Sequence, residues 1–468
     1  MGTVGINFGA ATSGTGFDVT TTVASIVSNL KAVETPWTTQ LTSLKAQDTA
    51  FTSIGTDLGT LSSSLLALTD FQGVMASKLG SSSDTNILSL GSAGPTAVAG
   101  SHTIVVSQLA QTSSQYTDPV PASDTLGGAL TIRVGAGTAT TIPVVSGTSD
   151  TLATYAAAIN LADIGVRASV ISDTTGSRLA LVSQTSGLAG QLTVTSGGST
   201  PAATYGALTD TSAGTNGTVV GMNTGLLGQD AQLTVDGLSV DSASNTVSST
   251  IPGVTFQLLS SDPSTKVQVQ IANDNNSVET AFSGLVTAYN KVVNDIKTQE
   301  GNNTSGNPQP LFGNTVLSQI QSSLSLSLTS GAASGGISSL YQLGISVNQD
   351  GTLKLDTTAL DSELNSNYSD VVGFLQNAGS FGQKFSIALD QIGNSSPTGA
   401  ITLALAADSS QETTFSADIT AQDSLIATQQ TTLTNKLNSA NQTLQAIPQQ
   451  LNEIDELYSA LTGYNTKS

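Results

Sequence analysis

The chain has 468 residues, of which only 10% are charged, and its 33 acidic against 13 basic side chains give a net charge of −20. This acidic balance disfavours binding to nucleic acids or to anionic membrane surfaces, because phosphate groups would be repelled. The absence of cysteine excludes disulfides, thiolate metal sites and thiol catalysis.

Two kinds of targeting segment are not expected from the sequence. No stretch approaches the roughly 18–20 apolar residues that span a bilayer, so no membrane insertion is expected. The first residues contain no Lys or Arg before Lys31 and no continuous apolar run, so a cleaved secretory signal peptide is not expected. A cytosolic protein and one exported through a dedicated channel both fit this pattern.

Apolar residues recur every three or four positions between residues 23 and 68, which predicts helices with one apolar face. Thr20 to Thr22 are candidate N-cap residues. Pro36 lies inside the first run, so a break or kink between two helices is expected near it.

The middle of the chain, residues 85–275, alternates short apolar runs with Gly and Asn turn signals, which predicts β-sandwich or barrel-like domains. A helix is expected at residues 151–160, whereas residues 184–230, rich in Gly, Ser and Thr, are expected to form loops. The strand-like runs are residues 102–109, 130–134, 178–182, 232–235, 254–259 and 266–271.

Helical spacing returns at residue 277, and after a link that starts at Gly301 it continues to about residue 330 and from 360 to 392. The last apolar stripe, residues 433–461, keeps a regular spacing of four and three. It predicts a helix over residues 425–461, roughly 55 Å long, with a kink or break near Pro448. Such a stripe requires partner helices, either from the N-terminal stretch or from other subunits, and both remain open.

These regions together predict an α+β multidomain fold. Both termini form a helical, coiled-coil leg, and β-rich head domains of sandwich or barrel-like type are inserted between them. Four parts are expected: terminal coiled-coil helices (1–40 with 425–468), a helical leg domain (41–75 with 275–424), a β-rich head domain (76–117 with 220–274) and a second inserted β-rich head domain (118–219).

Catalytic and metal-binding motifs are not found, and the chain is predicted not to be an enzyme. His102 is the only imidazole, and we expect it at the surface or on an edge strand. Residues 346–357 resemble a calcium loop, but Ser346 and Thr357 stand where Asp and Glu are required. A turn between strands 343–347 and 352–355 is expected there, and no catalytic, metal or cofactor-binding residue is assigned.

Several blocks of the sequence carry a more specific signal. Residues 228–260 contain a Val-Asp-Gly turn and the pair Ser244-Asn245, and residues 285–296 contain Ala288-Tyr289-Asn290. These blocks resemble the flagellar hook-associated protein 2 family, the filament cap. Four further blocks are similar to the family. Residues 6–41 contain the segment Glu34 to Pro36, and residues 97–115 contain the segment Gln108 to Ala110. Residues 151–187 resemble a repeat shared by flagellins and hook-associated proteins, and residues 343–356 form the last block.

The resemblance implies a secreted protein at the distal tip of the bacterial flagellum, exported through the type III channel after release from an export chaperone. It implies a ring-like homo-oligomer whose helical legs and β-rich plate promote the folding and insertion of flagellin and prevent its loss. An extracellular adhesin that binds glycans or a host surface through the β-rich head is the alternative, also as an added role. The heptad residues expected to face other copies or flagellin are Val23, Ile26, Leu30, Leu433, Leu437, Leu444, Ile447, Leu451, Ile454 and Leu461.

Overall fold

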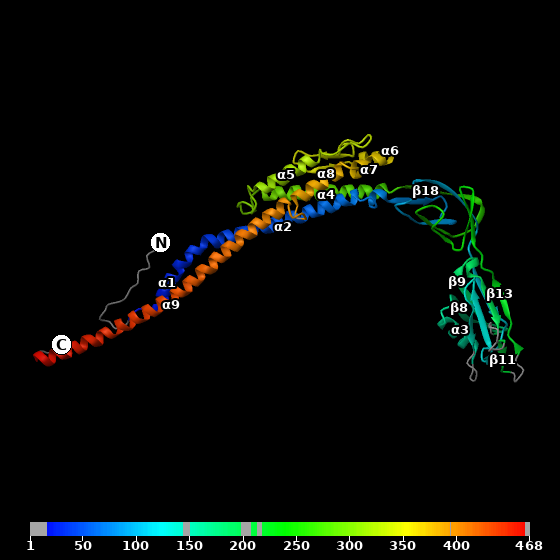
Figure 1. The fold of residues 1–468 in the computed structure, drawn as a ribbon, viewed down its shortest axis with the longest axis horizontal. Coiled ribbons are helices and arrows are strands. Elements are labelled where there is room, and N and C mark those ends of the chain that lie inside the picture. Colours follow the sequence, from blue (N-terminus) through cyan, green and yellow to red (C-terminus); the bar gives the residue numbers. More distant parts are fainter. Residues whose placement is uncertain (1–15, 144–149, 198–206, 213–217, 394, 464–468) are drawn as a thin grey trace. The chain divides into compact units, whose positions relative to one another are not determined.

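The computed structural model describes residues 16–143, 150–197, 207–212, 218–393 and 395–463. It divides into two compact units, each described by itself: a helical unit (Met1–Thr69 with Glu279–Ser468) and a β-rich unit (Asp70–Val278). Helices dominate at both ends of the chain and strands dominate in its middle (Figure 1). The predicted α+β multidomain class is therefore confirmed, whereas the finer division into four parts stays a prediction.

The helical unit is built around two long helices, α2 and α9. A short 3-10 segment, η1 (Ala32–Glu34), separates α1 from α2, and the strands β19 and β20 pair as an antiparallel hairpin. The elements are α1 (Val19–Lys31), α2 (Thr35–Thr69), most of α4 (Asn275–Gln299), α5 (Thr315–Ser327), β19 (Ile345–Val347), β20 (Leu353–Leu355), α6 (Thr357–Ser366), α7 (Tyr368–Gln376), α8 (Phe381–Ile392) and α9 (Ala400–Thr462).

The N-terminal helices begin and end where local chemistry requires it. Asp18 caps α1, because its carboxylate accepts a hydrogen bond from the Thr21 backbone N–H, 3.1 Å away. The expectation of a cap at Thr20 to Thr22 is therefore wrong by two to four residues. The break near Pro36 is confirmed, and it precedes the proline, which lies in the first turn of α2 where its missing N–H costs little.

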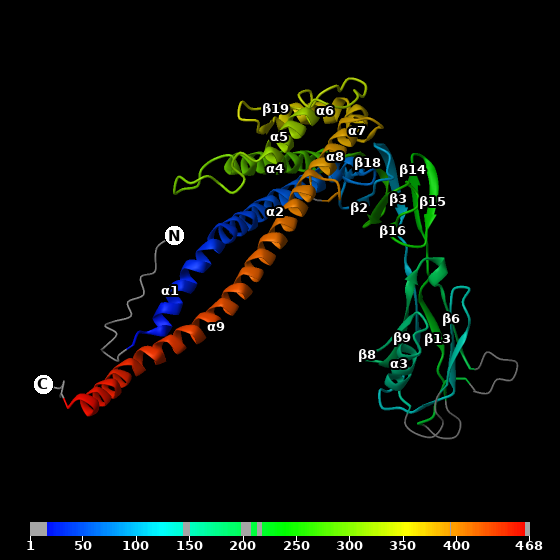
Figure 2. The same ribbon diagram turned by 60° about the vertical axis from the view of Figure 1, so that its left-hand side comes forward.

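Helix α9 runs without a break from Ala400 to Thr462, through Pro448. The expected helix over residues 425–461 is confirmed and begins 25 residues earlier, and the expected helix break at the proline does not occur. Helices α1 and α2 both pack against α9. Their direction is antiparallel to it, since Phe17 N–H donates to Asn441 Oδ1 (2.9 Å) while Lys31 Nζ lies 3.0 Å from Asp423 Oδ1 (Figures 1 and 2).

The apolar stripe of α2 forms the centre of the helical core. Its side chains are almost completely removed from water, which stabilises the unit by about 1.5–3 kcal/mol for each. Helices α7 and α8 both contact α2 and add a row of stacked phenylalanines. The buried residues of the α2 stripe are Phe51, Ile54, Leu58, Leu61, Leu65 and Leu68.

The β-rich unit contains two separate hydrophobic cores. The first lies between a five-stranded antiparallel sheet, in the order β1-β18-β3-β14-β15, and a three-stranded sheet, β16-β17-β2, because strands of both contribute to one cluster. The short 3-10 segment η2 (Val74–Ala76) precedes these strands. The strands are β1 (Lys78–Ser82), β2 (Leu88–Ala93), β3 (Gly100–Gln108), β14 (Ala231–Val235), β15 (Leu238–Ser242), β16 (Thr246–Val247), β17 (Val254–Leu258) and β18 (Asp262–Asn273).

The second core joins a four-stranded sheet, β13-β4-β9-β8, two three-stranded sheets and the helix α3 (Leu152–Leu161). The expected helix at 151–160 is confirmed. Its remaining elements are β4 (Thr112–Thr117), β5 (Leu126–Gly127), β6 (Ala129–Val134), β7 (Thr140–Pro143), β8 (Val166–Asp173), β9 (Gly176–Ser186), η3 (Leu188–Gly190), β10 (Leu192–Ser196), β11 (Thr209–Asp210), β12 (Thr218–Val219) and β13 (Met222–Leu226).

Two expectations for the middle of the chain need correction. Residues 184–230 were expected to be loops, yet they contain β10 and β13, because Leu192 and Val194 alternate with threonines and enter the core. His102 was expected at the surface or on an edge strand; it does not lie on an edge strand, since β3 is the central strand of its sheet, but its ring is partly exposed at the surface. The imidazole is about a quarter exposed and lies beside Asp236.

Three asparagines from the sequence blocks have one structural role in common. The side chain of Asn290 accepts a hydrogen bond from Leu353 N–H (2.6 Å) and donates one to Leu353 C=O (2.8 Å). The side chain of Asn245 binds both backbone groups of Ala110 in the same way. Asn160 does so with Ala168. Each amide thus pairs both backbone groups of one distant residue, because its side chain carries a donor and an acceptor side by side.

Replacing Asn290 with alanine should lower the free energy of unfolding of the helical unit by about 2 kcal/mol, because both backbone groups of Leu353 lose their partner. Chemical denaturation followed by hydrogen exchange in β20 measures the loss. Asn294, exposed one turn further along α4, provides the matched control, and its change to alanine should have little effect. Equal stabilities of the Asn290 and Asn294 variants would contradict this role.

Candidate functional site

The predicted heptad residues of α1 lie on the face that packs against α9. Val23 is buried, and Ile26 and Leu30 are half-buried. These three side chains therefore take part in the internal helix pair, whichever other contacts they make.

The heptad residues of α9 fall into two groups. Leu433, Leu437, Leu444 and Ile447 are half-buried. The rest are exposed, with 42% of the surface of Leu451, 62% of that of Ile454 and 85% of that of Leu461 open to solvent. The C-terminal end of α9 extends beyond α1 (Figures 1 and 2).

Leu457 and Tyr458 widen this exposed face, because each lies three or four residues from Ile454 and Leu461 on the helix. Leu457 was not among the predicted residues, although its position three residues after Ile454 places it on the same face of the helix. We call the set Leu451, Ile454, Leu457, Tyr458 and Leu461 the terminal stripe. A contiguous apolar face of this kind marks an interaction surface when it stays exposed.

Several hydroxyls beside the stripes are occupied within α9 itself. The hydroxyls of Thr431, Thr434, Ser439 and Thr443 each donate to the backbone carbonyl four residues earlier. These hydroxyls are therefore already engaged in the helix and are not free to donate to a partner.

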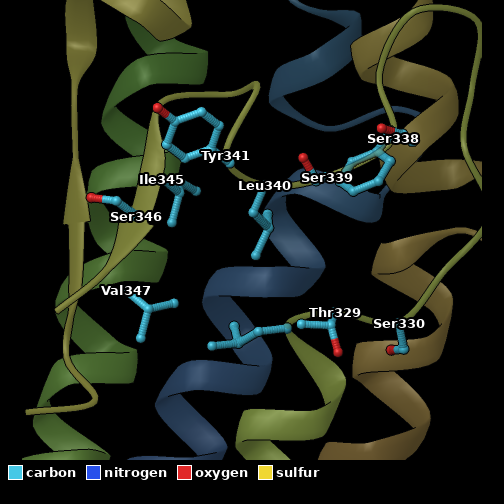
Figure 3. A pocket seen from close by; sticks show the side chains of 11 residues that line it. Thr329, Ser330, Ser338, Ser339, Leu340, Tyr341, Ile345, Ser346 and Val347 are labelled. Carbon is cyan, nitrogen blue, oxygen red and sulfur yellow. The ribbon is translucent and has the colours of Figure 1, made fainter. Parts of the chain in front are cut away.

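A cavity of about 430 Å³ lies elsewhere in the helical unit, between the end of α5, the β19 strand and α7 (Figure 3). Tyr341, Ile345 and Val347 line one side of it, and Thr329 and Ser330 lie across from them. Six of its eleven lining residues carry a hydroxyl, the other five are apolar, and none is an acid, a base or an imidazole. This cavity does not bring together groups for acid–base or nucleophilic catalysis.

The titratable pairs of the structure serve to hold turns and helices. His102 Nδ1 lies 2.8 Å from Asp236 Oδ2, and this contact, with the Thr103 backbone N–H, lowers the pKa of Asp236. Lys291 Nζ lies 3.1 Å from Asp57 Oδ2 and 2.6 Å from Asp295 Oδ2, which ties α4 to α2.

The loop that resembles a calcium site is the turn of the β19–β20 hairpin. The carboxylate of Asp350 accepts hydrogen bonds from the side chain and backbone of Thr352 and pairs with Lys297 at 3.3 Å. The Thr352 hydroxyl foremost lowers the pKa of Asp350 to about 2. Within the described part of the chain, no group of three or more His, Cys, Asp or Glu side chains is arranged to hold a metal ion.

None of the described helices is long and apolar enough to cross a lipid bilayer. Helices α2, α4 and α9 have the required length, but Ser, Thr, Asn and Gln side chains interrupt their apolar residues throughout.

The chain is similar to proteins of the bacterial flagellum. The family model described as flagellar hook-associated protein 2 C-terminus matches residues 228–463, and that of the N-terminus matches residues 15–113. Residues 114–227, between the two matches, include the second core of the β-rich unit.

Curated relatives show the same similarity at moderate identity. The chain is 28% identical over 319 residues to B-type flagellar hook-associated protein 2 of Pseudomonas aeruginosa, which covers 64% of this chain and 66% of that protein. It is 27% identical over 377 residues to flagellar hook-associated protein 2 of Escherichia coli O157:H7, covering 76% and 78% of the two chains. The chain thus spans just under two thirds of the first relative's length.

A solved structure resembles much of the fold. The crystal structure of the D1-D2-D3 domains of the Escherichia coli flagellar cap protein FliD is 26% identical, with a TM-score of 0.59, and covers 77% of this chain and 99% of that chain.

Proposed function

Because this chain belongs to the flagellar hook-associated protein 2 family, we propose that it caps the distal tip of a bacterial flagellar filament, where exported flagellin folds and inserts beneath it. The observation that carries this proposal is the terminal stripe on α9, an apolar face left exposed by a chain with well-buried cores. The similarity to a flagellar cap protein of Escherichia coli supports the same role.

In this proposal the cap is a ring-like oligomer of identical chains. Leu451, Ile454 and Leu461 pack against neighbouring copies or against flagellin helices. The heptad residues Val23, Ile26, Leu30, Leu433 and Leu437 keep α1 on α9. Apolar packing without fixed ion pairs lets the contacts change partners as each flagellin subunit is added. The heptad spacing suits such helix-to-helix packing.

The proposed route to the filament tip is the type III export channel, with a chaperone bound before secretion. The acidic, cysteine-free composition supports this route, since a chain without thiols cannot become cross-linked while it is unfolded. The role requires no catalytic step.

A genetic test in the bacterium that encodes the chain decides the proposal. Loss of the gene should leave short filaments and release flagellin monomers into the medium, and the full chain should restore elongation. A chain that lacks residues 433–468 should fail to do so, because it has lost the terminal stripe and part of the α9 face that packs against α1.

A chain shortened only by residues 464–468 is the matched control and should restore normal filaments. Normal filament length and normal flagellin retention without residues 433–468 would overturn the proposal. Electron microscopy of filament length and immunoblots of the medium provide both measurements.

A further inference from the structure

Three acidic side chains lie between α2 and α9, within the packing of the helical unit. Asp48 belongs to α2, and Asp408 and Glu412 lie one turn apart on α9. Only 9% of the Asp408 surface is exposed. One carboxylate oxygen on each of the three residues is buried and has no hydrogen-bond donor.

Among the described residues, the helices packed around this cluster contribute no cation to it. Helix α9 contacts α1, α2, α5 and α8, and α5 contains no titratable residue. On α1, Lys31 is paired with Asp423. Helix α2 carries two other charged residues: Lys45, which is exposed, and Asp57, which is paired with Lys291. Helix α8 carries Lys384 and Asp390. The charges that act on Asp408 are those of Asp48 and Glu412, both negative.

A bound proton resolves this arrangement. Ionised carboxylates only accept hydrogen bonds, so neither Asp48 nor Asp408 can satisfy the other when both are charged. One proton converts the pair into a donor and an acceptor, and the two side chains then form a hydrogen bond. The carboxylates of Asp48 and Asp408 are then paired with each other, and part of the repulsion between the helices disappears.

We propose that Asp48, Asp408 and Glu412 form a proton-dependent catch that tightens the packing of α2 on α9 when the cluster holds a proton and loosens it when all three are ionised. This inference does not depend on the proposed cap function, because it concerns only the two helices and their carboxylates. It makes the helix pair responsive to the acidity of its surroundings.

The direction of the effect follows from linkage. Burial, together with the charge of Asp48 and a hydrogen bond to it, raises the pKa of Asp408 from 3.8 to about 6. The resulting stabilisation is complete below the unfolded value and is lost as the pH rises through the folded value. Between pH 5 and pH 7.5 the opening of the helix pair should therefore become about tenfold more favourable.

Hydrogen exchange of the full chain tests the catch, with opening constants corrected for the intrinsic pH dependence of exchange. The readout is the amides of residues 44–52 and 404–416. Asp408→Asn supplies a permanent hydrogen-bond donor to Asp48. In this variant the packing of α2 on α9 should therefore open as rarely at pH 7.5 as at pH 5. Asp418→Asn changes an exposed aspartate of the same helix and should keep the tenfold pH dependence of the parent.

Asp48→Asn provides a second variant should Asp408→Asn fold poorly, and it should also remove most of the pH dependence. The catch is overturned if the parent opens equally at both pH values. It is also overturned if Asp408→Asn and Asp48→Asn keep the pH dependence of the parent, because the proton would then bind elsewhere.

Discussion

A chain in which Ile454, Leu457 and Leu461 are changed to glutamine should fold as stably as the parent but should no longer assemble with itself. The three side chains are exposed in the single chain, so their removal costs folding no more than about 0.5 kcal/mol each. Glutamine is as good a helix former as leucine, so the end of α9 should stay helical.

The loss of assembly should be large. Full burial of one such side chain contributes about 1.5–3 kcal/mol, so three of them contribute about 5 kcal/mol or more for each copy. Because every 1.4 kcal/mol is tenfold in affinity, self-association should weaken by at least about 1000-fold. Sedimentation velocity over a range of concentrations measures this change, and thermal unfolding measures the stability of the single chain.

The matched control uses two other exposed leucines of α9, Leu403 and Leu425, changed to glutamine in the same way. These residues lie outside the terminal stripe, so the control should assemble as the parent does. If the control and the stripe variant lost assembly equally, exposed apolar surface in general would be responsible, and the specific role of the stripe would be refuted.

Much of the fold could be predicted from the sequence because periodicity reports which face of an element is apolar. The helices α2, α3, α4 and α9 followed from such spacing, and so did six of the longer strands. Short strands were harder to predict. In β10 only Leu192 and Val194 enter the core, and two apolar residues among threonines are not distinguishable from a loop by pattern alone.

The candidate site was less predictable for a related reason. The stripe from Leu433 to Leu461 is equally regular along its length, yet its first part is half-buried and its last part is exposed. Periodicity identifies an apolar face but does not say what covers it. The three asparagine contacts show the reverse case, since Asn245 and Asn290 were noted as parts of sequence blocks, but their backbone partners only became apparent in three dimensions.

Position in a sheet also depends on contacts that are distant in sequence. His102 lies on the central strand β3 because β14 and β18, both more than a hundred residues later, pair on its two sides. Its ring is nevertheless partly exposed, since the face opposite the core is open and Asp236 provides a partner there. A polar residue on one strand therefore predicts the exposed face of a sheet and does not predict its edge.

Replacing Phe381 with alanine should lower the free energy of unfolding of the helical unit by about 4 kcal/mol. Its ring is buried and stacks on that of Phe374, with centroids 5.4 Å apart, and on that of Phe385, with centroids 5.3 Å apart. The substitution leaves a cavity where α7 and α8 meet, and it also removes two aromatic contacts of about 0.5–1.5 kcal/mol each.

The chain has two units, so one unfolding curve need not describe both. Calorimetry combined with hydrogen exchange in α7 and α8 separates them, and the loss should appear in the helical unit while exchange in β3 and β14 stays unchanged. Phe312, which is exposed in the same unit, provides the control, because its change to alanine removes no buried contact. An equal loss in both variants would show that the phenylalanine row does not hold the two helices. A loss confined to Phe381→Ala would identify this row as the packing that keeps α7 and α8 in place beside α2.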